Sequence, residues 1–214
     1  MKYFLNAGTL LLLLTLSTLF IIPVLPDRLL PVFYPLCFTG IIIAASLSLE
    51  RSKRFHVSAA IILSAMLLIA IIADLEWLQI ISRSLQGIYF IIVVMALVRE
   101  IASSRQVNTA VIVNAITAYF LLGMALSLVA TIIAVKVPNA YNIDLMPLTH
   151  PQRYNSFREM TYYTFITYTT TGYGDITPTA PASRSLAVVI SSFGQLYIAI
   201  IIAMLMGKFT SASK

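Results

Sequence analysis

The chain alternates long apolar runs with short polar or proline-containing breaks. The apolar runs lie near residues 3–22, 32–49, 57–74, 80–98, 109–136 and 184–207. An α-helix needs about 20 predominantly apolar residues to cross the hydrocarbon of a bilayer, and most of these runs reach that length. The pattern predicts an all-α membrane protein with six transmembrane helices.

The fourth run is the weakest of the six. Its start is interrupted by the polar stretch 82–86 (SRSLQ), which leaves a short apolar segment at 88–98. We retain it as a span because an even number of spans agrees with the charge distribution described below. Arg83 and Arg99 are interpreted as helix-end residues whose long side chains reach the lipid headgroups.

Composition agrees with a membrane protein. The 214 residues are 59% hydrophobic and only 10% charged, whereas a soluble domain is about 25% charged. The formal net charge is +6, but the basic residues are scattered, and the densest basic cluster is the short stretch 51–54. Membrane topology explains this pattern better than nucleic-acid binding, so no nucleic-acid partner is expected.

The distribution of charge predicts the orientation. With both termini and the loops after the second and fourth spans inside, eight basic residues lie inside and six outside, and six of the eight acids lie outside. This arrangement follows the positive-inside rule. We therefore predict a multi-pass protein of the cell membrane, with both termini cytoplasmic and the segment between the last two spans facing outside.

That segment reads as a loop, a short helix and then irregular backbone. Residues 137–155 contain three prolines and no hydrophobic period, and a helix of about 13 residues follows, capped by Asn155 or Ser156. Such a helix is too short to cross a membrane. A short helix followed by irregular backbone between two spans is the layout of a re-entrant loop, which is tolerated only where protein or water surrounds it.

The backbone of Thr170-Thr171-Gly172-Tyr173-Gly174 carries the candidate chemistry. Glycine adopts positive φ at little cost, so glycines alternating with bulkier residues allow successive carbonyls to point the same way. Four copies around an axis would form cages of eight oxygens that replace the water shell of a cation, with the Thr170 hydroxyl at the inner end. The stretch predicts a site for a dehydrated monovalent cation.

Together with Asp175, this stretch resembles the selectivity filter of the potassium channel family, whose usual form is Thr-Val-Gly-Tyr-Gly-Asp. The resemblance extends to the pore helix at about 156–169 and the inner helix at 184–209. It implies a homotetrameric channel in which Thr170, Thr171, Gly172 and Tyr173 hold potassium. The implied partners are further copies of the chain, membrane lipids and potassium ions, without a cofactor or enzymatic activity.

Several positions depart from the usual family pattern. Thr171 replaces the usual valine or isoleucine, but its contribution is a backbone carbonyl, so potassium selectivity is expected to survive. Ile166 stands where some bacterial members have a buried glutamate, so the link from that glutamate to Asp175 is missing. Tyr162 and Tyr163 occupy positions where many members have tryptophan. Either their hydroxyls brace the filter or their rings only pack against it.

The last helix contains the candidate gate. Gly194 lies 19 residues after Asp175, the distance at which family members place a hinge glycine. A mid-helix glycine permits bending, but it equally permits a close helix contact. Positions one turn apart are predicted to line the cavity and its inner mouth, with the last two as an apolar constriction: Gln195, Ile198, Ile202 and Met206.

We predict two domains, a four-helix module at 1–105 and a pore domain at 106–214. The pore domain comprises an outer helix, the pore helix, the filter and the inner helix. The module resembles a voltage sensor in helix count only, because Arg83, Arg99 and Arg105 are spaced by 16 and 6 residues rather than at every third position. Conventional voltage gating is therefore not expected.

Three alternatives to a potassium-selective channel remain open. The first is a weakly selective monovalent cation channel. The second is a membrane transporter, although the carboxylates lie near helix ends or in loops rather than at mid-depth. The third is a non-conducting subunit that assembles with other channels.

Overall fold

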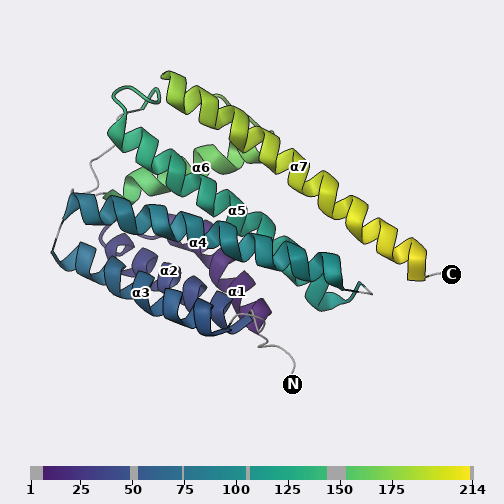
Figure 1. The fold of residues 1–214 in the computed structure, drawn as a ribbon. Coiled ribbons are helices and arrows are strands. Elements are labelled where there is room, and N and C mark those ends of the chain that lie inside the picture. The colour runs from purple at the N-terminus through teal and green to yellow at the C-terminus, as the bar shows by residue number, and fades with distance from the viewer. Residues whose placement is uncertain (1–6, 49–52, 74, 105–106, 144–152, 213–214) are drawn as a thin grey trace.

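The computed structural model describes residues 7–48, 53–73, 75–104, 107–143 and 153–212, which are almost entirely helical (Figure 1). The first helix, α1 (Ala7–Leu16), continues through a π-helical turn, Ser17–Ile21, and a 3-10 turn, Ile22–Val24. The remaining helices are α2 (Leu30–Ser48), α3 (Lys53–Ile72), α4 (Glu76–Ser103), α5 (Thr109–Lys136), α6 (Arg153–Tyr168) and α7 (Pro181–Ala212). The all-α prediction is confirmed over these residues.

Within the described ranges, four helical segments are long and apolar enough to cross a membrane. They are Ala7–Val24, Trp77–Ser103, Thr109–Lys136 and Pro181–Lys208. The apolar parts of α2 and α3 are shorter, at Val32–Ser48 and His56–Ala70. The predicted spans 32–49 and 57–74 are thus not among the four, and residues 3–6 of the first predicted span lie outside the described residues.

α4 differs from the prediction for the fourth run. The helix begins at Glu76 and passes without interruption through the polar stretch 82–86. It does so because its polar side chains face inward, where Gln79, Ser82, Arg83 and Gln86 are all buried. The interpretation of Arg83 as a helix-end residue was therefore wrong, since it lies within the helix with only 8% of its surface exposed.

A small cavity adjoins Arg83 in the interior of the bundle. Its volume is about 20 Å³, and Gln79 and Gln86 line it together with apolar side chains from α2, α3, α5 and α6. A space of this size has room for about one water molecule. Polar side chains from the first part of α4 thus meet among side chains of the neighbouring helices.

α5 is the central helix of the fold, and its predicted bounds, 109–136, are confirmed. The Asn108 side chain accepts a hydrogen bond from the Val111 N–H at 3.0 Å, which satisfies a free donor at the helix start. α4 and α5 lie side by side (Figure 1), and α5 also packs against α1, α6 and α7. One continuous core therefore joins helices on both sides of the predicted domain boundary, which itself falls at residues 105–106, outside the described residues.

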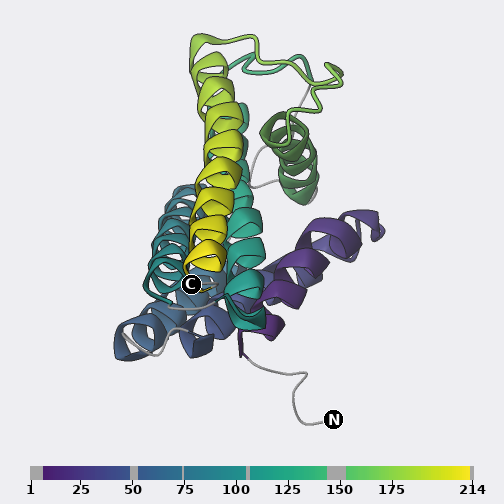
Figure 2. The ribbon, with the colours of Figure 1, turned by 90° about the vertical axis from the view of Figure 1, so that its right-hand side faces the viewer.

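α7 lies along one side of the bundle (Figure 2) and packs mainly against α5 and α6. Only 17% of the apolar stretch of α7 is buried, whereas 61% of the apolar stretch of α5 is buried. The large apolar side chains that it leaves exposed include Val188, Phe193, Leu196, Ile200, Ile202 and Met206. Such an extended apolar surface is of the kind that lipid or further protein chains cover.

Two glycines allow α6 to lie close to its neighbours. A Cβ atom at Gly123 of α5 would lie 2.5 Å from the Phe165 ring, and one at Gly194 of α7 would lie 2.0 Å from the Tyr168 carbonyl oxygen. Both distances are too short for any side chain. Gly194 thus has a packing role, and α7 continues through it as a helix.

We expect Gly123→Ala to destabilise the protein by about 1–3 kcal/mol, because the new methyl group overlaps the Phe165 ring. Thermal unfolding in detergent would measure the loss. Gly207→Ala is the matched control, since a Cβ there meets nothing within 4 Å and gains the same helix propensity. Phe165→Leu should recover stability in the Gly123→Ala background. Equal melting temperatures for the two alanine variants would contradict the close contact.

Candidate functional site

The pore-loop segment, residues 169–180, connects the end of α6 to the start of α7. The predicted pore-helix range of 156–169 shifts, because α6 already includes Arg153 and ends at Tyr168. The predicted cap at Asn155 or Ser156 is therefore wrong. Asn155 lies inside the helix, and its Nδ2 donates to Asp27 Oδ2 at 3.4 Å.

The last turn of α6 holds the first residues of the segment. The Ile166 carbonyl accepts from the Thr171 N–H at 2.9 Å and from the Gly172 N–H at 3.2 Å, and the Thr167 carbonyl accepts from the Thr170 N–H at 3.1 Å. Backbone that has left the helix is thus still hydrogen-bonded to it. Ile166, which stands at the position of the family's buried glutamate and which we predict to support the filter, contacts the segment through its backbone carbonyl.

The sign of the backbone angle φ alternates from residue to residue along the predicted filter. φ is positive at Thr170 (62°), Gly172 (57°) and Gly174 (78°), and it is not positive at Thr171 or Tyr173. Such an alternation is the backbone pattern that allows successive carbonyl oxygens to point the same way. The sequence led us to expect positive φ at the two glycines.

Thr170 was not expected to have positive φ. A β-branched residue rarely adopts this conformation, which costs about 1–3 kcal/mol and persists only where the surroundings impose it. The hydrogen bond from its N–H to the Thr167 carbonyl is one such constraint. At Gly172 and Gly174, a Cβ would meet nothing within 4 Å, so the requirement for glycine there comes from the backbone rather than from space.

The alternating segment lies on the surface of the single chain. Residues 169–175 are all exposed, and the Tyr173 side chain is 71% exposed. Among the described residues, no group of three His, Cys, Asp or Glu side chains is arranged as metal ligands would be. Besides the Tyr173 hydroxyl and the Asp175 carboxylate, the oxygen atoms that the segment offers to a cation are backbone carbonyls and threonine hydroxyls.

The side chain of Asp175 is held by one of the two predicted support tyrosines. The Tyr162 hydroxyl donates to Asp175 Oδ2 at 2.6 Å. This hydrogen bond lowers the pKa of Asp175 and raises the pKa of Tyr162 to about 12. Tyr163 instead packs edge-to-face against Tyr141, with 5.0 Å between the ring centroids. The two tyrosines therefore have different contacts.

Asn142, in the loop after α5, holds the backbone at the same end. Its Nδ2 donates to the Asp175 carbonyl at 2.9 Å, and its Oδ1 accepts from the Thr177 N–H at 2.7 Å. An antiparallel bridge between Tyr141 and Pro178 continues the contact. The chain thus returns after the pore-loop segment to the end at which α5 finished. Sequence reasoning missed Asn142, because nothing local marks a loop residue whose partner lies 33 positions away.

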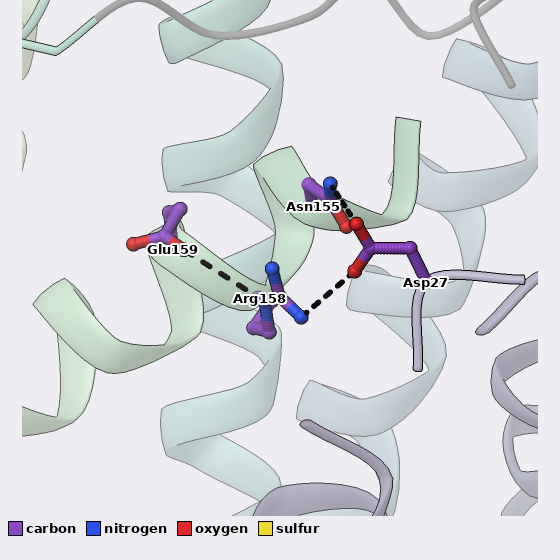
Figure 3. A network of polar contacts seen from close by, with 4 residues as sticks. All are labelled: Asp27, Asn155, Arg158 and Glu159. Atoms are coloured by element: carbon purple, nitrogen blue, oxygen red, sulfur yellow. Dashed lines mark hydrogen bonds and ion pairs between the residues drawn. The ribbon is translucent and has the colours of Figure 1, made fainter. Parts of the chain in front are cut away.

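A polar network joins the turn between α1 and α2 to the start of α6 (Figure 3). Arg158 Nη1 lies 3.2 Å from Asp27 Oδ1, and Arg158 Nε lies 3.7 Å from Glu159 Oε1. Asn155 binds the other oxygen of Asp27. The groups are partly exposed, so each ion pair is worth little by itself. Only the contacts of Arg158 and Asn155 with Asp27 connect α6 to another element, because Glu159 lies on α6 itself.

Phe157 anchors the same end of α6 in the core. Its ring makes edge-to-face contacts with Tyr34 at 5.3 Å and Phe38 at 5.4 Å, and Phe38 stacks on Phe90 at 5.9 Å. Aromatic pairs of this kind contribute about 0.5–1.5 kcal/mol beyond the burial of their area. Helices α2 and α4 thus help to position α6.

The predicted cavity and gate residues lie along one side of α7. Gln195, Ile198, Ile202 and Met206 are all exposed in the single chain, with Ile202 at 55% and Met206 at 60%. The opposite side of α7 carries Tyr197, whose hydroxyl donates to the Ala115 carbonyl of α5 at 2.8 Å. The predicted gate residues are therefore free to contact partners outside the chain.

Comparison with known families matches residues 116–211 to a family described as "Ion channel". The matched region runs from within α5 to near the end of α7 and contains the whole pore-loop segment. No protein of curated function and no solved structure matches the chain.

We expect Tyr162→Phe to raise the pKa of Asp175 toward the usual aspartate value of about 3.9, because the donor that favours the carboxylate is lost. A lowered folded-state pKa stabilises the fold at neutral pH, and this contribution disappears as pH falls through that pKa. Carboxyl carbon NMR of Asp175 over an acid titration would measure the shift. Tyr163→Phe should leave the titration unchanged, and an unchanged titration in Tyr162→Phe would refute the contact.

Proposed function

Because residues 116–211 belong to an ion channel family, we propose that this chain forms a homotetrameric potassium-selective channel in the cell membrane. The channel allows passive potassium flow. Each subunit supplies one pore-loop segment, and four segments around a common axis complete the ion sites. The function is transport rather than catalysis.

The observation that carries this proposal is the alternating backbone at 170–174. Positive φ at every second residue is the backbone pattern that allows successive carbonyl oxygens to form a row pointing the same way, and residues 170–174 are exposed in the single chain. A cation can replace its water shell only where oxygens surround it on all sides. One row is a quarter of such a cage, which supports an assembly of four copies.

The path of the chain supports a re-entrant pore. α6 has 16 residues, so it is about 24 Å long, less than the roughly 30 Å of the hydrocarbon core. Asn142, which follows α5, is hydrogen-bonded to the backbone of Asp175 and Thr177, so the chain lies beside the end of α5 before α7 begins. We assign α5 as the outer helix and α7 as the inner helix of the pore domain, 106–214, and residues 1–105 as a four-helix module.

In this arrangement α2 and α3 complete six spans despite their shorter apolar parts, and both termini are cytoplasmic. Potassium binds to oxygens of Thr170, Thr171, Gly172 and Tyr173, enters beside Gly174, and moves through the row by repulsion between ions. Ile202 and Met206 form the apolar constriction at the inner mouth. The single buried arginine of α4 does not amount to a conventional voltage sensor.

Ion flux into liposomes that contain the purified protein tests selectivity. We expect potassium flux to exceed sodium flux by at least about tenfold, because four carbonyl rows replace the potassium hydration shell. Gly172→Ala should abolish potassium flux, since alanine is strained at φ 57°. Gly87→Ala, on α4 and outside the filter, should conduct as the wild type does, since a Cβ there meets no atom closer than 3.8 Å. Equal sodium and potassium fluxes would identify a weakly selective channel, and flux unaffected by Gly172→Ala would exclude this pore.

The mass of the assembled protein tests the number of subunits. Native mass spectrometry should find four times the 23.6 kDa chain, because a closed ring of four is needed to surround the ion. The apolar surface of α7 would then be covered by neighbouring copies. A protein that stays monomeric and conducts potassium would contradict the assembly, whereas a monomer without flux would favour a non-conducting subunit.

A further inference from the structure

Lys208, near the end of α7, binds the end of α4. Its Nζ donates to the backbone carbonyls of Ile101, Ala102 and Ser104, the second at 2.9 Å, and it lies 3.1 Å from Ser104 Oγ. The last carbonyls of a helix have no partners within it and carry the negative end of the helix dipole. An ammonium group with three donors suits this position.

Two further contacts fix the same part of α7. Ile201 joins Ile101 of α4 and Val111 of α5 in a small separate apolar cluster. One turn earlier, the Tyr197 hydroxyl donates to the Ala115 carbonyl at 2.8 Å. Lys208, Ile201 and Tyr197 lie on one face of α7, so this face is held against α4 and α5 over several turns.

The held face differs from the face that carries the proposed gate. Successive side chains are rotated by about 100° around the helix axis. The Ile202 side chain is therefore about a third of a turn from that of Lys208, and the Met206 side chain is almost half a turn from it. Both gate side chains are exposed, whereas Lys208 is bound to α4. The Lys208 contact therefore pulls the end of α7 toward its own subunit and away from the side on which partner subunits would stand.

We infer that Lys208 is a positioning residue for the gate, which stabilises the open pore by holding the end of α7 against the end of α4. This inference rests on the proposed channel function. In the open pore, four lysines hold the inner helices apart. When the contact breaks, the ends of α7 are free to approach the axis, where Ile202 and Met206 close the mouth by excluding water. The four-helix module thereby biases the gate through its last helix, α4.

Single-channel recording in planar bilayers tests this role, with the full-length protein in potassium solution. We expect Lys208→Gln to lower the ratio of open to closed time by about tenfold or more, the effect of losing one charged hydrogen bond. Unit conductance and the preference for potassium over sodium should not change, because the filter is untouched. A purely structural role would instead reduce the yield of channels without changing their gating.

Three variants accompany this measurement. Ser104→Ala removes a hydroxyl that accepts from Lys208 and that itself donates to the Ile101 carbonyl. It should lower the open ratio less than Lys208→Gln does, and its effect should be smaller in the Lys208→Gln background. Thr210→Ala is the matched control, since its hydroxyl bonds only to Met206 of its own helix. Lys208→Arg keeps the charge and should retain most of the ratio of open to closed time. This variant also provides a test if the glutamine variant does not assemble.

An unchanged or increased open ratio in Lys208→Gln would overturn the inference while leaving the channel assignment intact. A wild-type protein that conducts no potassium would overturn the proposed function, and the inference with it. The wild-type recording therefore separates the two failures.

Discussion

Backbone that is neither helix nor sheet can lie at membrane depth only if its polar groups find partners inside the protein or in water. The segment between α6 and α7 meets this constraint at both ends. Ile166 accepts two N–H groups where the segment begins, and Asn142 binds its backbone on both sides of Ile176. Between these points, no hydrogen bond within the described part of the chain engages the carbonyl oxygens of residues 170–174, which leaves them available to an ion.

The position of α6 is the second requirement, since the segment starts from its last turn. Neighbouring helices hold α6 by close packing. Gly123 and Gly194 let α5 and α7 approach its later turns, while the ring of Phe157 fixes its beginning among side chains of α2 and α4. Because both halves of the chain contribute, the N-terminal helices are part of the support of the proposed filter.

Much of this arrangement could be predicted from the sequence, because it follows from local pattern. The bounds of α5 and positive φ at Gly172 and Gly174 depend on residue type and periodicity alone. The bounds of α4 were wrong, since burial of Arg83 depends on which side of the helix faces its neighbours.

Other features depend on residues far apart in the chain. Asn142, Arg158 and Lys208 look like ordinary loop or flanking residues, and their partners lie 33, 131 and between 104 and 107 positions away. The strained Thr170 conformation also has no local signal, because threonine by itself avoids positive φ. The sequence signal for it is the spacing of the two glycines. Positive φ at Gly172 and Gly174 implies positive φ at every second residue, and the position two residues before Gly172 is Thr170.

The exposure of residues 169–175 has a consequence for how the protein is made. A newly inserted subunit, alone in lipid, would present unsatisfied carbonyl groups to hydrocarbon, at several kcal/mol for each group. In the proposed channel, lipid would solvate a solitary subunit poorly, and this would favour its association with further copies. The oxygens that would select an ion would thus also destabilise an unassembled subunit in the bilayer. Only the complete assembly would be well solvated.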